Sequence, residues 1–490
     1  MTGGRTRVAL RWRPHPQVVF LIVLGVALGM ACGGGQASPP SGSSPAALSD
    51  SVDTAAVPSP APPTPTVSTL TPRHIVIEPG QPITTEGAVF YVDLETGATE
   101  GWELGIDIAP LAQVSPDGRY ILYGQHLLDT TTGAVCQLEG ASGWASAFSP
   151  DGRYFLVQTP AGMEKRTSES CGRQSEPLGV PLQGQGWVGK TSFHPGAAWS
   201  PSGDALVIWA YPDATTGYPS GAQSVYLVSP ELDKPTIVQV GDGQRASLPV
   251  AWSPAGERFA LASGTTLAAV DLRGQLLWST DIPGSSLANV RWSPDGRFVS
   301  VHAFPLPEEI EGQVYPGRND AVYVLDAGTG AIRFRLWGAS ACWGEVWTAD
   351  GHSLIVRGQR ADDFGWFVVT ADGASVRRLE AADGAFFVEP SPRDLDVAAF
   401  LGRPTYPGGQ VGGVQGPLMV LDLESGLAVP VLDISLENRS PGWDPAHSLP
   451  RWLSDGRLVF FTGIEGHGGC EMGPRLPELE VQVPPFDAGG

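Results

Sequence analysis

The sequence predicts an all-β protein built from repeated four-stranded units, because it is rich in turn residues and carries one motif along most of its length. Of its 490 residues, 63 are Gly and 45 are Pro, which is about twice the share of turn residues in an average protein. This composition argues against a helical protein. An apolar content of 42%, with 15 Trp and 17 Phe, is sufficient for a sizeable core.

The recurring motif is Ser-Pro-Asp-Gly-Arg, in three full copies and five weaker versions. The eight motifs begin at Ser115, Ser149, Ser200, Ser253, Ser293, Thr348, Ser391 and Leu453. Pro presets φ and Gly accepts a positive φ, so each motif predicts a tight turn between two strands. An aromatic residue stands directly before six of them, at Phe148, Trp199, Trp252, Trp292, Trp347 and Trp452. The mean spacing of about 48 residues leaves room for four short strands.

A second turn element, of the type Asp-x-x-Thr/Ser-Gly, lies further along several repeats. It occurs at 92–97, 128–133, 270–274, 325–330 and 421–426. Each repeat is therefore interpreted as strand a, first turn, strand b, loop, strand c, second turn and strand d. Such units in succession predict a single β-propeller of eight four-stranded blades, or seven if the Ser391 repeat is an insertion.

The repeats between residues 87 and 462 resemble the WD-type propeller repeats of TolB-like proteins, in which an aromatic residue precedes S-P-D-G and an apolar strand follows. The resemblance implies the fold and says little about activity, because propellers have many functions. Residues 87–104 supply a c strand and a d strand before the first motif. We expect them to complete the last blade, begun at Arg451, so that the ring has no open edge.

The first 31 residues predict an export signal. A basic stretch without acids is followed by an apolar run from Val18 to Met30, which is shorter than the roughly 20 residues needed to span a membrane. The Ala31–Cys32 junction resembles the lipobox of bacterial lipoproteins, which implies that Cys32 is acylated. Gly29 stands where that family usually has an aliphatic residue, and ordinary cleavage after Ala31 is the alternative.

The predicted domain organisation is a signal peptide at 1–31, a tether at 32–72 that begins with the lipidated Cys32, and a propeller at 73–490. Residues 33–72 contain nine Pro and no aromatic residue, so they have no apolar face to bury. The net charge of −21 argues against a nucleic-acid partner. We expect a monomeric head on the outer face of the bacterial membrane or in the periplasm, attached to the membrane through the lipid alone.

Four cysteines remain if Cys32 carries lipid, namely Cys136, Cys171, Cys342 and Cys470. An even set in an oxidising compartment predicts structural disulfides, of which three pairings are arithmetically possible. We favour Cys136 with Cys171, because they lie in consecutive repeats and we place Cys171 in a long b–c loop. No C-x-x-C spacing is present, and this argues against a metal cluster.

One face of the propeller is the candidate binding surface. The a–b and c–d turns lie at one end of the blades, so the longer b–c and d–a connections gather at the other end. Its candidate residues are Trp144, Trp187, His194, Tyr211, Tyr218, Glu308, Glu309, Tyr315, Trp343, Tyr406 and Trp443. The alternative to a binding role is a structural one, in which the aromatic residues only pack the loops against the scaffold and the acidic residues are simply exposed to solvent.

Catalytic motifs are absent from the sequence. It has no G-x-S-x-G, P-loop, H-E-x-x-H or Rossmann glycine pattern, and we predict neither a metal nor a cofactor. His194, His302 and His352 lie in different repeats. The segment 325–330 with Trp337 is similar to the tryptophan-docking repeat of eight-bladed quinoprotein dehydrogenases, but the acidic, calcium-linked centre of that family has no counterpart here.

The favoured interpretation is therefore an exported, membrane-anchored binding or scaffold protein. Its long-loop face would contact an envelope protein, a peptide or a glycan. The alternative is an extracytoplasmic hydrolase or lyase with carboxylates at the mouth of the propeller channel, and a quinoprotein dehydrogenase ranks third.

Overall fold

The computed structural model places every described residue in the unit Ser68–Gly490. The described residues are 72–85, 87–105, 112–141, 145–159, 161–180, 196–210, 224–230, 232–238, 250–282, 285–305, 308–310, 313–315, 321–339, 345–360, 363–383, 385, 388–394, 396–401, 414–436, 450–462 and 479–484. The predicted signal peptide, Cys32 and nearly all of the tether lie outside them. No helix in the described ranges is long and apolar enough to cross a membrane.

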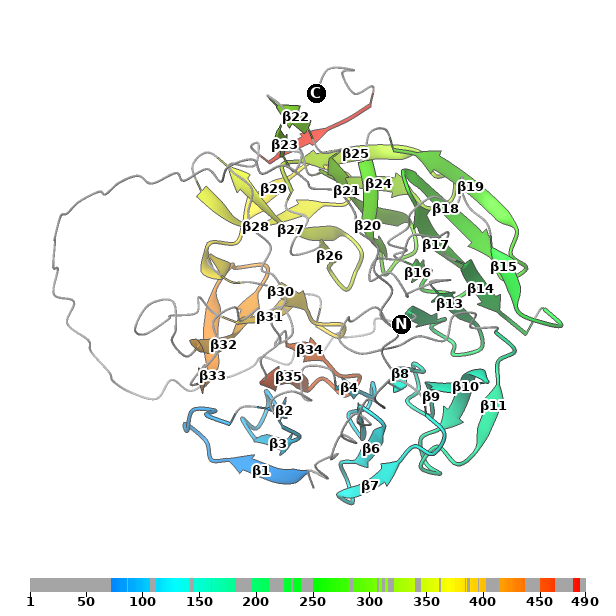
Figure 1. Cartoon of the computed structure of the whole chain (residues 1–490). Helices are drawn as coiled ribbons and strands as arrows, with labels where there is room; N and C mark the ends of the chain where they lie inside the picture. Colours follow the sequence, from blue (N-terminus) through cyan, green and yellow to red (C-terminus); the bar gives the residue numbers. More distant parts are fainter. Residues whose placement is uncertain are drawn as a thin grey trace, which may run out of the picture. The chain divides into compact units, whose positions relative to one another are not determined.

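Eight sheets follow one another around a central axis, and strand a of each sheet lies innermost (Figure 1). Blade 1 contains β4 (Gln113–Val114), β5 (Tyr120–Tyr123), β6 (His126–Asp129) and β7 (Ala134–Gln137). Blade 2 contains β8 (Ala145–Phe148), β9 (Tyr154–Thr159), β10 (Gly162–Thr167) and β11 (Ser175–Pro177). Blade 3 contains β12 (Gly196–Trp199), β13 (Leu206–Ala210), β14 (Ser224–Val228) and β15 (Thr236–Val238).

The next four blades repeat the same order. Blade 4 contains β16 (Val250–Trp252), β17 (Arg258–Ser263), β18 (Thr266–Asp271) and β19 (Leu276–Asp281). Blade 5 contains β20 (Ser285–Trp292), β21 (Phe298–Pro305), β24 (Ala321–Asp326) and β25 (Ile332–Trp337). Blade 6 contains β26 (Val346–Trp347), β27 (Ser353–Arg360), β28 (Asp363–Thr370) and β29 (Val376–Arg378). Blade 7 contains β30 (Val388–Pro390), β31 (Val397–Leu401), β32 (Val414–Asp422) and β33 (Ala428–Leu436).

The eighth blade joins the two ends of the propeller. It combines β34 (Arg451–Trp452) and β35 (Leu458–Thr462) with β2 (Ala88–Val92) and β3 (Thr99–Glu103). β2 pairs antiparallel with β35, from Ala88 opposite Thr462 to Val92 opposite Leu458. The predicted closure by residues 87–104 is confirmed. The Ser391 motif joins β30 to β31, so its repeat is a blade and the count is eight.

Four features of the structure were not predicted from the sequence. β1 (Arg73–Ile77) adds a fifth strand outside β3, and β36 (Glu480–Gln482) adds one outside β25. The segment after the last blade therefore contributes a strand to blade 5. A hairpin of β22 (Glu308–Ile310) and β23 (Gln313–Tyr315) lies within the b–c connection of blade 5, and the 3-10 helix η3 (Glu380–Ala382) follows β29.

The turn motif owes its sequence to hydrogen bonds as well as to backbone geometry. The Ser115 hydroxyl accepts a bond from the Tyr120 backbone N–H at 2.8 Å and donates to Asp117 Oδ1 at 2.5 Å. Asp117 Oδ1 also accepts from the Arg119 backbone N–H at 3.1 Å, and Gly118 has φ +75°. The motifs at Ser149, Ser293 and Thr348 make equivalent bonds. These four motifs thereby satisfy their buried polar groups locally.

The Trp that ends strand a joins its blade to the preceding one. Trp199 Nε1 donates to the Ala147 carbonyl at 2.9 Å, and Trp252 Nε1 donates to the Ala198 carbonyl at 2.8 Å. Trp292 and Trp452 make the same contact with the carbonyls of Ala251 and Glu389. Buried apolar side chains of adjacent blades pack together around these contacts, as in blades 4 and 5 and in blades 7 and 8. The core is therefore a series of layers between neighbouring blades.

Candidate functional site

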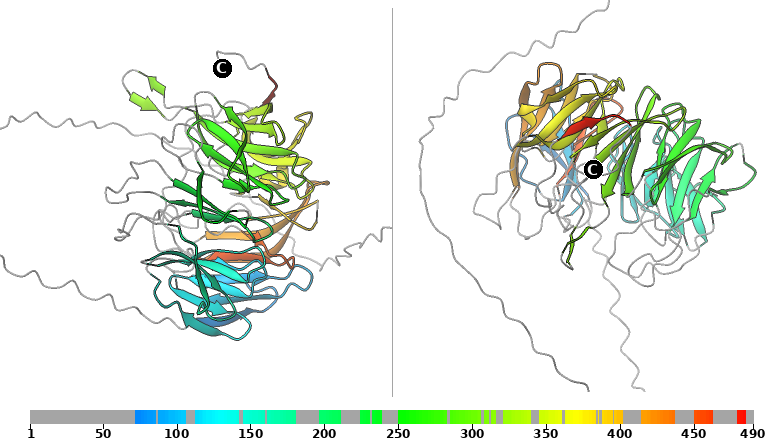
Figure 2. Two further views of the ribbon diagram at one scale, coloured as in Figure 1. Left: turned by 90° about the vertical axis from the view of Figure 1, so that its right-hand side faces the viewer. Right: turned by 90° about the horizontal axis from the view of Figure 1, so that it is seen from above.

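The candidate residues of the long-loop face fall mostly outside the described residues. Those outside are Trp144, Trp187, His194, Tyr211, Tyr218, Trp343, Tyr406 and Trp443. Glu308, Glu309 and Tyr315 lie on the β22–β23 hairpin, where Glu308 stands opposite Tyr315. The hairpin stands out from the sheets of the ring (Figure 2). Its backbone therefore places an acidic residue opposite an aromatic residue.

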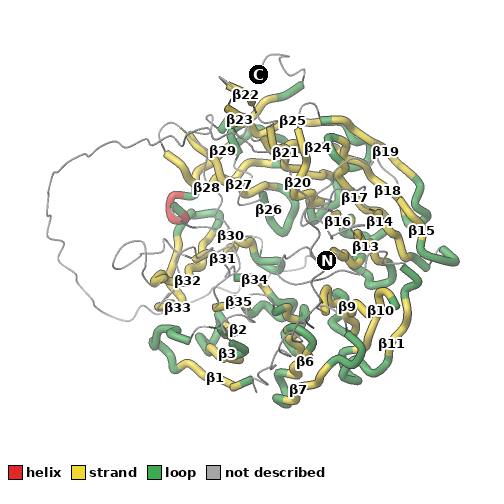
Figure 3. The backbone as a smooth tube through the Cα atoms, viewed as in Figure 1, coloured by secondary structure: helices red, strands yellow, loops and turns green. Residues whose placement is uncertain are grey.

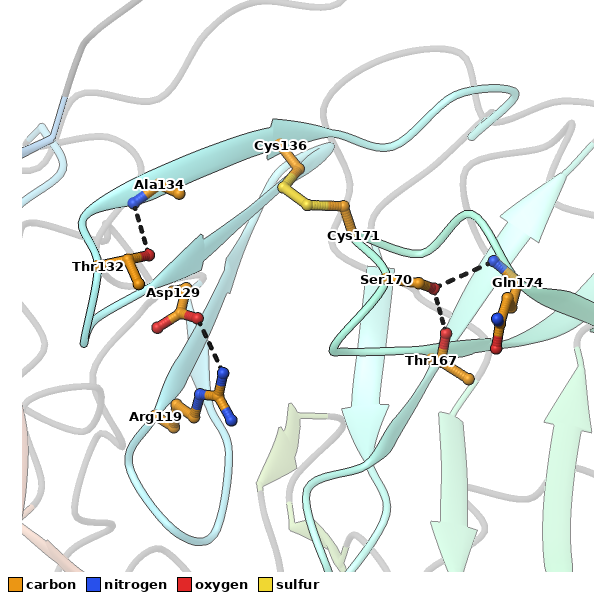
Figure 4. Close-up of a disulfide and its surroundings, with 9 residues drawn as sticks. All are labelled: Arg119, Asp129, Thr132, Ala134, Cys136, Thr167, Ser170, Cys171 and Gln174. Atoms are coloured by element: carbon orange, nitrogen blue, oxygen red, sulfur yellow. Dashed lines mark hydrogen bonds and ion pairs between the residues drawn. A yellow bond between two sulfur atoms is a disulfide. The ribbon is translucent and has the colours of Figure 1, made fainter.

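A disulfide links blades 1 and 2. Cys136 on β7 is bonded to Cys171, and their Cα atoms are 5.7 Å apart (Figure 4). Cys171 lies in the turn between β10 and β11. It therefore belongs to a short c–d turn, and its expected place in a long b–c loop was wrong. Cys32, Cys342 and Cys470 lie outside the described residues.

A second set of side chains, not singled out from the sequence, occupies one equivalent position on each innermost strand. This position is the second residue before each turn motif, and the innermost strands surround the axis (Figure 3). We term the set the axial ring, which consists of Gln113, Ala147, Ala198, Ala251, Arg291, Val346, Glu389 and Arg451. Its composition is uneven around the axis, because blades 2, 3 and 4 contribute only Ala.

The polar members of the axial ring occupy the opposite arc. Arg291, Arg451 and Gln113 are exposed, and Glu389 is half-buried. Gln113 Oε1 accepts a hydrogen bond from the Ala147 backbone N–H at 2.7 Å, which holds its side chain against blade 2. The ring thus has an apolar arc on blades 2 to 4 and a charged arc on blades 5, 7 and 8.

The two arginines of the charged arc differ from the arginines of the turns. Arg119 pairs with Asp129 at 3.2 Å, and Arg457 pairs with Asp455 at 2.7 Å. Within the described part of the chain, Arg291 and Arg451 make no ion pair or hydrogen bond. Among the described residues, these two guanidinium groups on innermost strands therefore have no salt-bridge partner.

A buried polar cluster lies beside Arg291, between blades 5 and 6. Ser300 stands opposite Arg291 in the sheet, so the two side chains point to the same face of blade 5. Trp347 Nε1 donates to the Ser300 hydroxyl at 3.1 Å, and that hydroxyl donates to Glu345 Oε1 at 3.2 Å. His302 Nδ1 lies 4.0 Å from Glu345 Oε2, and both side chains are fully buried.

This cluster departs from the pattern of the other blades. At the strand-b position of Ser300, six other blades have apolar residues, namely Leu122, Val207, Ala260, Ile355, Ala399 and Val459. β20 is also irregular between Ala288 and Arg291, and Asn289 has φ +49°. A bulge in an innermost strand redirects the side chains that follow it. The irregular strand therefore coincides with the only polar substitution at this position in these blades.

Burial shifts the titration of three groups in this region. It raises the pKa of Glu345 to about 7, although the positive charge of Arg291 opposes the change. It also raises the pKa of Glu389 to about 7, against the opposing charges of Arg291 and Arg451. Burial lowers the pKa of His302 to about 3. Two carboxyl groups near the axis therefore change charge close to neutral pH, while the imidazole is neutral there.

The sequence held a signal for the axial ring. Aligning the eight turn motifs places Gln, Ala, Ala, Ala, Arg, Val, Glu and Arg at one position, and a charge at a strand-a position near the axis is unusual against that background. The contact between Ser300 and Glu345 had no such signal, because 45 residues separate them. In the described residues, no group of three or more His, Cys, Asp or Glu side chains is placed to hold a metal ion.

Comparisons with known proteins found similarity in structure but none in sequence. The chain matches no protein-family model and none of the curated proteins in sequence. It is similar in structure to a putative TolB from Agrobacterium tumefaciens, with 15% identity, 77% of this chain and 98% of that chain covered, and a TM-score of 0.35.

Two further solved structures are similar. One is the Cps50 (Swd1) β-propeller domain of Myceliophteria thermophila, with 12% identity, 59% and 92% of the two chains covered, and a TM-score of 0.36. The other is the dihydro-heme d1 dehydrogenase NirN in complex with DHE, with 16% identity, 75% and 78% covered, and a TM-score of 0.45. At such identities and scores, these similarities carry no argument about activity.

Proposed function

We propose that this chain is an exported, membrane-anchored binding protein whose propeller presents a recognition surface to an envelope protein, a peptide or a glycan. One observation carries the proposal, namely the difference between the two ends of the blades. The a–b turns are short in all eight blades, whereas the b–c connections of blades 3, 5 and 7 span 211–223, 306–320 and 402–413. A uniform scaffold with variable connections at one end is the arrangement that binding proteins commonly use.

The decisive experiment is retention of envelope components on the purified head, followed by alanine replacement on the long-loop face. We expect Trp187, Tyr211, Tyr218, Tyr315 and Trp343 to include the anchors, because aromatic side chains dominate interface energies. Loss of one anchor should weaken binding by about thirtyfold, which corresponds to about 2 kcal/mol. A partner that bound all five variants equally, but lost binding after charge changes in the S-P-D-G turns, would place the surface at the other end.

The anchor has its own test. The change Cys32→Ser removes the thiol that a lipid would occupy, so we expect the chain to leave the membrane fraction. The matched control is Cys136→Ser with Cys171→Ser, which leaves the junction intact. Retention of the Cys32→Ser variant in the membrane would mean that the uncleaved apolar segment or a partner holds the chain there.

A second candidate function is supported by Glu345 and Glu389. They stand at or next to innermost strands of adjacent blades, and both have a pKa of about 7, which suits a general acid or base. An extracytoplasmic hydrolase or lyase would use such carboxyls. Turnover of glycan or peptide substrates by the purified head, lost in Glu345→Gln and Glu389→Gln, would favour the enzyme over the binding protein.

A further inference from the structure

The charged arc of the axial ring contrasts with the charge of the whole chain. The protein has a net charge of −21, yet Arg291 and Arg451 are exposed and make no ion pair within the described residues. Both lie close enough to Glu389 to lower its pKa, and Arg291 acts in the same way on the carboxyl of Glu345. Two cations therefore flank the half-buried Glu389 near the axis.

A guanidinium group is well suited to bind a carboxylate, because its planar fork donates two parallel hydrogen bonds. The nearby acids compensate Arg291 and Arg451 only partly, since burial raises the pKa of both Glu345 and Glu389 to about 7. The charged arc thus has unused capacity for a negative group.

The opposite arc is suited to an apolar group. Ala147, Ala198 and Ala251 are only partly buried and carry no long side chain. Their backbone carbonyls already accept the indole N–H bonds of the next blades, so these main-chain groups do not compete for a ligand. A molecule with an anionic end and a hydrocarbon end would meet a matching surface on each arc.

We propose that the axial ring binds a small organic acid, with its carboxylate between Arg291 and Arg451 and its hydrocarbon part against Ala147, Ala198 and Ala251. This site lies on the innermost strands, two residues before the S-P-D-G turns, and is distinct from the long-loop face. It does not depend on the proposed function. Variants of Tyr211 and Tyr218 should therefore leave acid binding unchanged.

The test is calorimetric titration of the purified full-length protein with hexanoate and with acetate at pH 7. We expect hexanoate to bind at least tenfold more tightly than acetate, because acetate lacks a chain to cover the alanine arc. Arg291→Gln and Arg451→Gln should each weaken hexanoate binding at least tenfold. The control is Arg173→Gln, which removes an exposed arginine of the β10–β11 turn and should change nothing.

Further titrations distinguish a small organic acid from a peptide C terminus as the source of the carboxylate. The tripeptide Gly-Ala-Leu with a free carboxyl end is compared with its amide. Tight binding of the free form alone would assign the site to peptide C termini and overturn the small-acid proposal.

Glu389→Gln should strengthen hexanoate binding about threefold, because it removes a competing negative charge. The proposal is also overturned if hexanoate and sulfate bind equally, or if Arg291→Gln and Arg451→Gln fold normally by circular dichroism and bind hexanoate as the unchanged protein does.

Discussion

A tryptophan at the end of strand a makes different hydrogen bonds in two interfaces, the one between blades 3 and 4 and the one between blades 5 and 6. Trp252 donates its indole N–H to the backbone carbonyl of Ala198. Trp347, at the equivalent position, donates to the side chain of Ser300, which in turn donates to the buried Glu345. The first bond needs only a backbone, whereas the second needs a particular side chain in the neighbouring blade.

This difference explains how the propeller tolerates variation. A backbone acceptor is present whatever residue occupies strand a, so the repeat can change there without leaving an indole N–H unsatisfied. The side-chain acceptor between blades 5 and 6 brings a carboxyl and an imidazole out of water, at a cost in free energy that the regular interfaces avoid. Such departures from a repeat are more informative about function than the repeat itself.

The largest effect is expected from a deletion that opens the ring at the eighth blade. Removing residues 87–104 eliminates β2 and β3, which leaves β1 without a partner and one edge of β35 unpaired. Exposed strand edges favour aggregation, so we expect loss of cooperative unfolding in a urea titration. Deletion of residues 33–72, which have no aromatic residue, should leave the transition unchanged. Equal tolerance of both deletions would show that the ring closes in another way.

The pH dependence of stability should distinguish the interface between blades 5 and 6, which contains Glu345, from the interface between blades 3 and 4. Burial raises the pKa of Glu345 from 4.5 to about 7, so the folded state binds the proton more tightly than the unfolded state. The contribution of this carboxyl is therefore fully present below pH 4.5 and is lost as the pH rises through 7, with a total on the order of 3 kcal/mol. Glu345→Gln cannot ionise, and we expect it to exceed the unchanged protein in free energy of unfolding at pH 8.

The contribution of His302 to the free energy of unfolding should change with pH in the opposite direction. Its pKa falls from 6.5 to about 3, so its contribution is present above pH 6.5 and is lost as the pH falls towards 3. Urea titrations from pH 4 to pH 8 should show a steeper decline on the acid side for the unchanged protein than for His302→Gln. If Glu345→Gln and the unchanged protein had parallel pH profiles above pH 5, the carboxyl of Glu345 would not be buried in the folded state.

A smaller effect is expected from removing one indole N–H at each interface. Trp252→Phe leaves the Ala198 carbonyl without its donor and should cost about 1 to 2 kcal/mol, equally at pH 5 and pH 8. Trp347→Phe removes the donor to the Ser300 oxygen and so weakens the hydroxyl as a donor to the Glu345 carboxylate, because hydrogen bonds in a chain strengthen one another and bonds to a charged group are the stronger ones. We therefore expect Trp347→Phe to cost more at pH 8, and equal costs at both values would contradict the comparison.

The smallest effects on stability are expected from substitutions in the a–b turns, which all eight blades contain. A Cβ at Gly118 would lie 2.8 Å from Leu453 Cδ1, whereas a Cβ at Gly296 would lie 3.8 Å from its nearest neighbour, Pro254 Cδ. Both glycines have φ above +70°, so Gly296→Ala should cost about 1 kcal/mol. Gly118→Ala should cost more in the same urea titration, because Leu453 must also move.

Much of the fold could be predicted from residues that act locally. The bonds from Ser115 and Asp117 stay within the turn that they form, so the motif can be identified without knowledge of distant contacts. The contacts of the candidate site could not be predicted in this way. Ser300 and Glu345 meet only because blades 5 and 6 lie side by side, and nothing in the neighbourhood of either residue along the chain indicates the other.

The sequence by itself determined the eight repeats, their turns and the closure of the ring, because the period of the motif and the missing strands of the last blade can be counted. Only the tertiary structure decided that β36 extends blade 5, that β1 extends blade 8, and that Arg291 and Arg451 both lie close enough to Glu389 to lower its pKa. The physical reason is that these arrangements depend on sheet edges and side chains from distant segments, whose proximity arises only when all eight blades are assembled.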